Sequence, residues 1–158
     1  MPRQQQLTLE VLQCNINHCA RAQDLLLQHM AQWCISATIV SEPYFVPPHP
    51  SWVSDTEGVV AITIPRMGDR PPLVKLSAGP GYVAARWGEI ILIAVYFAPS
   101  KPRSDFDSLL IEVGRIVAGA APVPVIVAGD FNAKSQMWGS PVTDIRGRIL
   151  ADWVVASG

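Results

Sequence analysis

The chain has 158 residues, of which 49% are hydrophobic and 16% are charged, so it can bury a sizeable core and is not an intrinsically disordered protein. Lys and Arg together number 12, and Asp and Glu together number 13. The formal net charge of -1 excludes a protein that binds nucleic acid through bulk positive charge alone. The length favours one domain, covering residues 1–158.

Composition also limits the cellular setting. The three cysteines have no framework spacing and are expected to be reduced thiols of an intracellular protein, with no structural zinc. The N-terminal residues lack the apolar segment of a signal peptide. The longest apolar run, residues 90–98, is about half of the roughly 20 residues that a membrane-spanning helix needs, so no membrane partner is expected.

The first elements in chain order predict a βαβ unit. Residues 7–14 alternate loosely between apolar and polar side chains and predict a strand. Apolar residues at helical spacing follow over 18–34, and 37–40 is a short apolar run. Strand, helix and strand within so short a stretch predict a parallel pair. The four prolines of 43–55 predict a loop.

The next segments predict antiparallel strands and a second helix. Residues 58–64 form an apolar strand pattern, 66–72 a turn region, and 81–87 with 89–97 a hairpin about a glycine. The second helix is predicted to open at Ser104, with Asp107 completing a capping box. Its apolar stripe consists of Phe106, Leu109, Leu110, Val113, Ile116 and Val117.

Two elements remain near the end of the chain. Residues 124–128 predict a buried strand, and an amphipathic helix is predicted from about Gly147, with Leu150, Trp153 and Val154 on it. Trp33 and Trp153 are interpreted as core residues on helices. Hairpin strands flanked by helices favour an α/β sandwich over a doubly wound sheet.

Polar side chains follow three of the apolar strands. Asn15, Glu42, Asp130 and Asn132 stand at these carboxyl ends, where α/β proteins bind ligands. Carboxylate and amide oxygens suit Mg²⁺ or Mn²⁺, and a further carboxylate is able to orient or deprotonate a water molecule. Tyr96 ends another strand and is able to donate a hydrogen bond to phosphate.

Each of these residues also has an ordinary structural interpretation. An Asp or Asn after a strand commonly forms a turn or caps a helix. Glu42 precedes a proline and fits a solvated loop, and Tyr96 fits a half-buried sheet position. His18 directly follows the first group of polar residues, and the simpler interpretation is that it opens the helix.

Four segments resemble the exonuclease–endonuclease–phosphatase superfamily. They are LQCNINH (12–18), SEPY (41–44), VYFAP (95–99) and GDFNA (129–133), and their order and separation match as well. SEPY, GDFNAKSQMWGS (129–140) and TDIRGRIL (143–150) further resemble the apurinic-type endonuclease domain of non-LTR retrotransposons of the R1-like and telomere-targeted kinds. The resemblance implies a four-layer α-β-β-α sandwich.

The resemblance also implies roles for individual residues. Glu42 and Asn15 would hold Mg²⁺ or Mn²⁺, with Asn17 near the metal. Asp130 would orient or activate the water, and Asn132 would bind the scissile phosphate, while Tyr96 would donate to it. The implied reaction is hydrolysis of a DNA phosphodiester in the nucleus, leaving a 3′-hydroxyl that primes a reverse-transcriptase domain of the same polyprotein.

Several side chains near the implied site are candidates for DNA contact. The basic ones on flanking loops are Lys101, Arg103, Lys134, Arg146 and Arg148. Their alternative interpretation is an ordinary solvated surface. Trp138 either touches a base or packs beneath its loop, and packing is favoured. Thr143 and Asp144 indicate a helix start ahead of Gly147.

The sequence departs from the family pattern in one respect. The family's last third contains a terminal Ser-Asp-His segment, whereas His18, His29 and His49 of this chain all lie outside such a context. We therefore expect a C-terminally truncated domain that lacks the last strands and has weak or no activity alone. Two alternatives stay open: a phosphodiesterase or phosphatase of the same superfamily acting on a small or lipid phosphate, and a non-catalytic relic.

Overall fold

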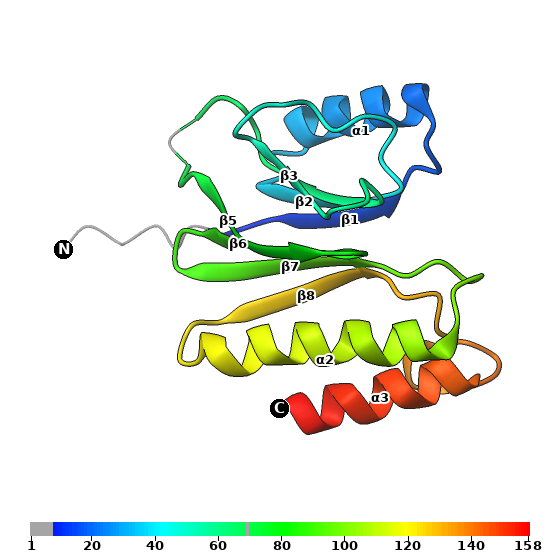
Figure 1. Cartoon of the computed structure of the whole chain (residues 1–158). Helices are drawn as coiled ribbons and strands as arrows, with labels where there is room; N and C mark the ends of the chain where they lie inside the picture. Colours follow the sequence, from blue (N-terminus) through cyan, green and yellow to red (C-terminus); the bar gives the residue numbers. More distant parts are fainter. Residues whose placement is uncertain (1–7, 69) are drawn as a thin grey trace.

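Two four-stranded β-sheets lie face to face, with helix α1 outside one sheet and helices α2 and α3 outside the other (Figure 1). The computed structural model describes residues 8–68 and 70–158. The elements are β1 (Val11–Asn15), α1 (Ala20–Gln32), β2 (Ala37–Ser41), β3 (Trp52–Ser54), β4 (Val60–Thr63), β5 (Leu73–Gly79), β6 (Tyr82–Trp87), β7 (Ile90–Tyr96), α2 (Arg103–Ala120), β8 (Val125–Asp130), the 3₁₀ turn η1 (Gln136–Trp138) and α3 (Ile145–Ser157). The predicted four-layer α-β-β-α sandwich is confirmed.

The first sheet has the strand order β1-β2-β4-β3. The predicted βαβ unit is confirmed, since β1 and β2 pair in parallel on either side of α1 in the chain. The predicted strand over 7–14 is observed from Val11, and its first residue lies outside the described residues. The predicted loop over 43–55 was wrong at its end, because β3 pairs with β4 there. Three residues behind a run of prolines are too short for a period-2 pattern.

The second sheet has the order β5-β6-β7-β8. The predicted antiparallel hairpin is β6 and β7, while β5 had not been predicted because its bulge at 75–77 interrupts the alternation. The prediction of a buried strand over 124–128 was wrong in one respect. Strand β8 pairs only with β7, which leaves it at the sheet edge with Ile126 39% exposed.

Three apolar clusters fill the spaces between the four layers. The predicted stripe of α2 packs on the outer face of the second sheet, with Phe106 and Val113 fully buried. The predicted capping box does not form, because α2 begins after Pro102 and Ser104 lies within its first turn. Trp33 was wrongly placed in the core: it is 57% exposed and stacks on the ring of His29.

Helix α3 is capped at its first turn and is only partly buried. Asp144 caps α3 by accepting a hydrogen bond from the Gly147 amide (2.7 Å), which confirms the predicted helix start. Leu150 is buried and the Trp153 indole donates to the Leu110 carbonyl (3.0 Å), whereas Val154 is 46% exposed.

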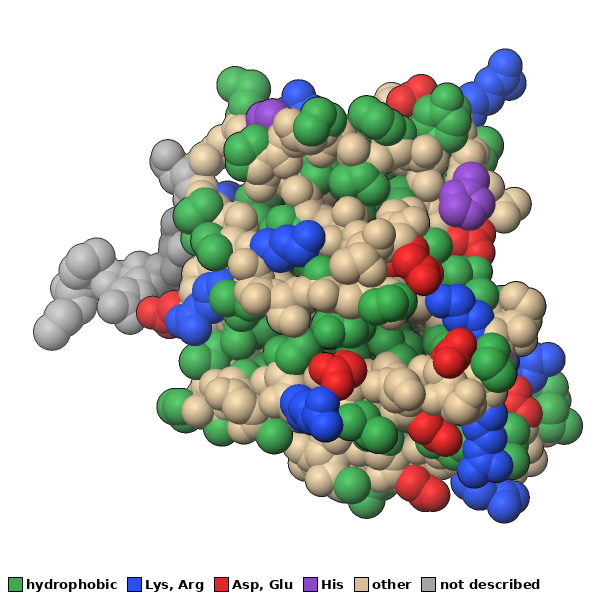
Figure 2. Space-filling model, viewed as in Figure 1, with side chains coloured by type: hydrophobic (Ala, Val, Ile, Leu, Met, Phe, Trp, Pro, Cys, Tyr) green, Lys and Arg blue, Asp and Glu red, His purple; other side chains and the backbone are tan. Residues whose placement is uncertain are grey.

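Within residues 8–68 and 70–158, no helix has the length and apolar character that a membrane crossing requires. Positive and negative side chains are interspersed over the face shown in Figure 2.

Candidate active site

The predicted site residues come from the carboxyl ends of strands in both sheets. The parallel register of β1 and β2 places Asn15 opposite Ser41, immediately before Glu42. The parallel register of β7 and β8 places Tyr96 opposite Asp130. Since the sheets are packed face to face, these four strand ends meet at one end of the sandwich. Two parallel pairs thereby build one site from residues far apart in the chain.

Asp130 joins the two sheets through its carboxylate. One oxygen, Oδ2, accepts a hydrogen bond from Nδ2 of Asn15 (3.3 Å), and Oδ1 accepts one from the backbone amide of Asn132 (3.0 Å). The Asn15 side-chain oxygen in turn accepts from the backbone amide of Asn17 (2.8 Å). Hydrogen bonds to both carboxylate oxygens fix the orientation of the Asp130 side chain between the two sheets.

Glu42 and Tyr96 form a second contact between the sheets. The Tyr96 hydroxyl donates to Oε1 of Glu42, and the Glu42 side chain is 17% exposed. Burial raises the pKa of Tyr96 to about 12, with further contributions from the hydrogen bond to Glu42 and the negative charges of Glu42 and Asp130. The phenol is therefore protonated at neutral pH. Its proton points at Glu42 rather than into open space, so donation to a phosphate requires the hydroxyl to rotate.

Two neighbouring groups complete this part of the site. The Asn132 side chain donates through Nδ2 to the Phe97 carbonyl (2.8 Å), which fixes the amide and leaves its second N–H free to be donated. His18 was predicted to open the helix, whereas α1 begins at Ala20, and the Nε2 atom of His18 lies 4.0 Å from Oε2 of Glu42. The approach of His18 to Glu42 rests on a turn after β1 that sequence spacing does not reveal.

The backbone at this end of the sandwich is unusual. Asn17, His18, Glu42 and Asn132 all have positive φ values, between 47° and 55°, and only one other non-glycine residue among the described ones does. Such conformations each cost of order 1–3 kcal/mol and persist where the surrounding structure enforces them. Four of the five non-glycine residues with positive φ among the described ones therefore lie at this end of the sandwich.

Gly129 sets the position of Asp130. Its φ is +149°, and a Cβ atom at this residue would stand 1.8 Å from the Val95 carbonyl oxygen. Only glycine therefore allows β8 to approach β7 this closely just before the site. The GDFNA segment needs its glycine for this approach, in addition to the polar residues that follow it.

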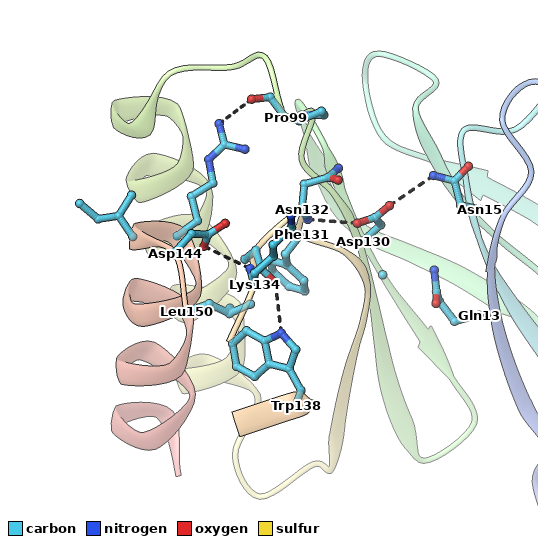
Figure 3. Close-up of a pocket in the computed structure, with 14 residues that line it drawn as sticks. Gln13, Asn15, Pro99, Asp130, Phe131, Asn132, Lys134, Trp138, Asp144 and Leu150 are labelled. Carbon is cyan, nitrogen blue, oxygen red and sulfur yellow. Dashed lines mark hydrogen bonds between the residues drawn. The ribbon is translucent and has the colours of Figure 1, made fainter. Parts of the chain in front are cut away.

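A groove of about 960 Å³ opens beside Asp130, between β1 and the α3 layer (Figure 3). Figure 3 shows Asn15, Asp130 and Asn132 at one side of it and Trp138 at another. The Trp138 indole donates to the Ala133 carbonyl (3.1 Å), so the ring is held in place while 42% of the residue stays exposed. The remaining lining residues are Gln13, Pro99, Gly129, Phe131, Ala133, Lys134, Asp144, Ile145, Arg146 and Leu150.

The predicted DNA-contacting cations divide into two groups. Arg146 donates to the carbonyls of Ala98, Pro99 and Lys101, and its guanidinium lies 4.9 Å from the centre of the Phe97 ring. This side chain fastens α3 to the loop after β7.

The other cations are more accessible. Lys101 forms an ion pair with Glu57 (3.1 Å), and Arg103 lies 4.0 Å from Asp107. Lys134 and Arg148 are exposed, and their charged ends make no hydrogen bond or ion pair with the described residues. Lys134, which lines the groove, is consequently the cation best placed to meet an anion there, while Arg148 is exposed on α3 outside the groove lining.

The donor chemistry of the site fits a hard divalent ion. The described part of the chain has no cluster of three or more His, Cys, Asp or Glu side chains that could hold a metal on its own. The convergent groups are the Glu42 and Asp130 carboxylates and the Asn15 amide, all oxygen donors. Mg²⁺ is commonly held by one or two carboxylates with water and substrate phosphate as its other ligands. Cys19 and Cys34 are exposed and Cys14 half-buried, each as a free thiol.

Comparisons with known proteins identify similar endonucleases. A family model described as endonuclease-reverse transcriptase matches residues 90–158. The endonuclease domain of TRAS1, a telomere-specific non-LTR retrotransposon, is similar with a TM-score of 0.77 and 26% identity over 95% of this chain and 72% of that chain. An AP endonuclease from Archaeoglobus fulgidus shares the fold, with a TM-score of 0.57 and 14% identity over 96% of this chain and 71% of that chain. No curated protein matches significantly. The family resemblance predicted from the sequence is confirmed.

Proposed function

We propose that this chain, which has the fold of the retrotransposon endonuclease that it resembles, hydrolyses DNA phosphodiesters in the presence of Mg²⁺ or Mn²⁺, with the weak activity expected of a C-terminally truncated domain. A nuclease-type function is supported by the family match and by the similar endonuclease structures. The observation that carries the proposal is the meeting of Asn15, Glu42, Tyr96 and Asp130 from both sheets at one end of the sandwich.

Asp130 is the group proposed to act on the water. Its two hydrogen-bond donors are an amide side chain and a backbone N–H, neither of which carries a formal charge. Each carboxylate oxygen thus keeps lone pairs that these donors do not use and that are able to accept a water proton. Asn132 holds its amide at the adjacent position, where its second N–H is able to donate to a phosphate oxygen.

Glu42 and Asn15 are proposed to hold the divalent ion. The ion would supply Lewis-acid stabilisation of charge on phosphate when bound. Tyr96 is bonded to the proposed ligand Glu42, and it stays protonated because its pKa is raised to about 12. Tyr96 therefore orients Glu42 in this structure, and its hydroxyl becomes a donor to phosphate if it rotates away from Glu42.

Exposed residues beside the groove are proposed to meet the DNA. Lys134, in the groove lining, and Arg148, exposed on α3 outside that lining, would contact backbone phosphates. Trp138 offers an exposed ring to a nucleotide base. Lys101 and Arg146 are less suited to this role because both are occupied within the protein. The proposed setting is the nucleus, with a reverse-transcriptase domain of the same polyprotein using the nick as a primer.

Nicking of supercoiled plasmid in Mg²⁺ tests the proposal. Asp130→Asn and Glu42→Gln keep the side-chain size, and each should lower the nicking rate by about 100-fold or more while the far-ultraviolet circular dichroism stays unchanged. Asp152→Asn is the matched control, because Asp152 is an exposed carboxylate on α3 outside the groove lining. The proposal fails if folded wild-type protein does not nick, or if the Asp130 variant nicks at the wild-type rate.

The same assay separates the two alternative functions. A phosphatase or phosphodiesterase of small substrates would release phosphate or alcohol from soluble esters faster than it nicks plasmid. A non-catalytic relic would do neither. Both outcomes contradict DNA hydrolysis as the main activity of the chain.

A further inference from the structure

Asp55 is a buried carboxylate that lies between the two sheets' turns, outside the contacts described above. It is 5% exposed, and it follows β3. Oδ1 accepts hydrogen bonds from the backbone amides of Val59 (2.8 Å) and Val60 (3.2 Å). Oδ2 accepts from the amides of Gly81 (2.9 Å) and Glu57 (3.2 Å). Four N–H donors thus surround a charge that has no ion-pair partner among the described residues.

Oδ1 of Asp55 contacts one turn, whereas Oδ2 contacts both, through Glu57 and Gly81. The Oδ1 side fixes the turn between β3 and β4, which belongs to the first sheet. The Oδ2 side reaches across to Gly81, in the turn between β5 and β6 of the second sheet. One side chain consequently ties the two sheets together at the end of the sandwich where the site lies.

Both turns accept backbone hydrogen bonds from site residues. The Val59 carbonyl accepts the backbone amide of Glu42 (2.8 Å), and the Gly81 carbonyl accepts the backbone amide of Tyr96 (2.9 Å). The second junction is tight, since a Cβ atom at Gly81 would stand 2.6 Å from the Tyr96 carbonyl oxygen. A single residue therefore links Asp55 to each of these two site residues: Val59 links it to Glu42, and Gly81 links it to Tyr96.

We propose that Asp55 is a positioning residue that sets the separation of Glu42 and Tyr96 by holding Val59 and Gly81 on its two oxygens. The positioning of Glu42 and Tyr96 by Asp55 rests on these hydrogen bonds alone. The effect of that positioning on catalysis rests on the proposed function. The carboxylate is required because it accepts on both oxygens. An Asn at 55 has one acceptor oxygen, and its NH₂ group would face two N–H donors.

Amide hydrogen exchange of the full chain tests this positioning. In Asp55→Ala, the backbone amides of Glu42 and Tyr96 should both exchange at least about tenfold faster than in wild type, because local opening no longer breaks the bonds to Asp55. Asp55→Asn should accelerate mainly one of these amides, since one oxygen remains. Val113→Ala is the control, as it shortens a fully buried side chain far from the turns.

The exchange pattern decides between positioning and general stability. If Asp55→Asn or Asp55→Ala accelerates all core amides by the same factor as Val113→Ala at equal loss of melting temperature, Asp55 only stabilises the fold and the proposal is overturned. Unchanged exchange at Glu42 and Tyr96 overturns it as well. Should Asp55→Ala not fold, the isosteric Asn variant gives the same decision.

Kinetics test the catalytic consequence separately. With plasmid and Mg²⁺, Asp55→Asn should lower kcat by about 100-fold and leave KM within about twofold. The reason is that the substitution misplaces the reacting groups, while residue 55 itself does not touch DNA. An equal change in KM and kcat argues against positioning. A wild-type protein without nicking activity refutes the proposed function, whereas the exchange result still decides the role of Asp55.

Discussion

Replacing Gly129 by alanine is the substitution that this structure predicts to be most disruptive for its size. One methyl group is added at a residue whose φ is +149°, and it would stand 1.8 Å from the Val95 carbonyl oxygen. Real Cβ atoms essentially never approach another heavy atom closer than 3.0 Å. The obstructing atom belongs to the backbone of β7, so it has no side-chain rotation available to relieve the overlap.

The loss of stability in Gly129→Ala has two sources: backbone strain at residue 129 and separation of β8 from β7. An unfavourable backbone conformation costs about 1–3 kcal/mol for a residue other than glycine. Separating β8 from β7 here breaks about two ladder hydrogen bonds, each worth roughly 1 kcal/mol net. The expected loss is thus about 3–5 kcal/mol in the free energy of unfolding, with loss of the Asn15–Asp130 contact.

Urea unfolding followed by circular dichroism measures this loss. Gly119→Ala is the matched control, because Gly119 lies in α2 and a Cβ there meets nothing within 4 Å. That variant should be neutral or more stable by up to about 1 kcal/mol, as expected for alanine in a helix. The reasoning is refuted if Gly129→Ala loses less than about 1 kcal/mol, since the Val95 carbonyl would then be free to move.

Four further substitutions give separate tests. Arg146→Ala should lower the free energy of unfolding by about 1–3 kcal/mol, because it removes three hydrogen bonds to backbone carbonyls. Arg148→Ala should leave stability unchanged and reduce the slope of log affinity for DNA against log salt concentration by about one. Thermal melts and salt titrations that show the reverse pattern would contradict both assignments. Tyr96 holds its proton more tightly folded than unfolded, so its contribution to stability is complete below about pH 10 and disappears as pH approaches 12. Tyr96→Phe should flatten that part of the stability–pH curve, and an unchanged curve would argue against the contact with Glu42. Phe106→Ala, at a fully buried position, should cost about 3–5 kcal/mol in chemical denaturation, and a cost below about 1 kcal/mol would show that the α2 layer repacks.

Much of the fold was predictable because long periodic segments reflect burial directly. The stripe of α2 from Phe106 to Val113 and the hairpin of β6 and β7 are of this kind. The short strand β3 and the bulged strand β5 were not predictable, because neither has enough regular alternation. The edge position of β8 depends on which strands pair, and its apolar composition resembles that of a central strand.

The site was predictable to the extent that strand ends predict convergence. Asn15, Glu42 and Asp130 were identified from their positions after apolar strands, and the structure places all three at the same end. Asp55 was not identifiable in this way, because all its partners are backbone amides, which every sequence has. Nor does the sequence distinguish Arg146, which turns inward, from Arg148, which does not.

The division of the site between two sheets has a consequence for the newly made chain. Asn15 and Asp130 are 115 residues apart, and Tyr96 is 54 residues from Glu42. Contacts of such long range form slowly, since the entropy of the intervening loop is lost before they exist. During synthesis, Asn15, Glu42 and Tyr96 leave the ribosome before Asp130 does. The groups of the candidate site therefore come together only after the second sheet has closed on the first.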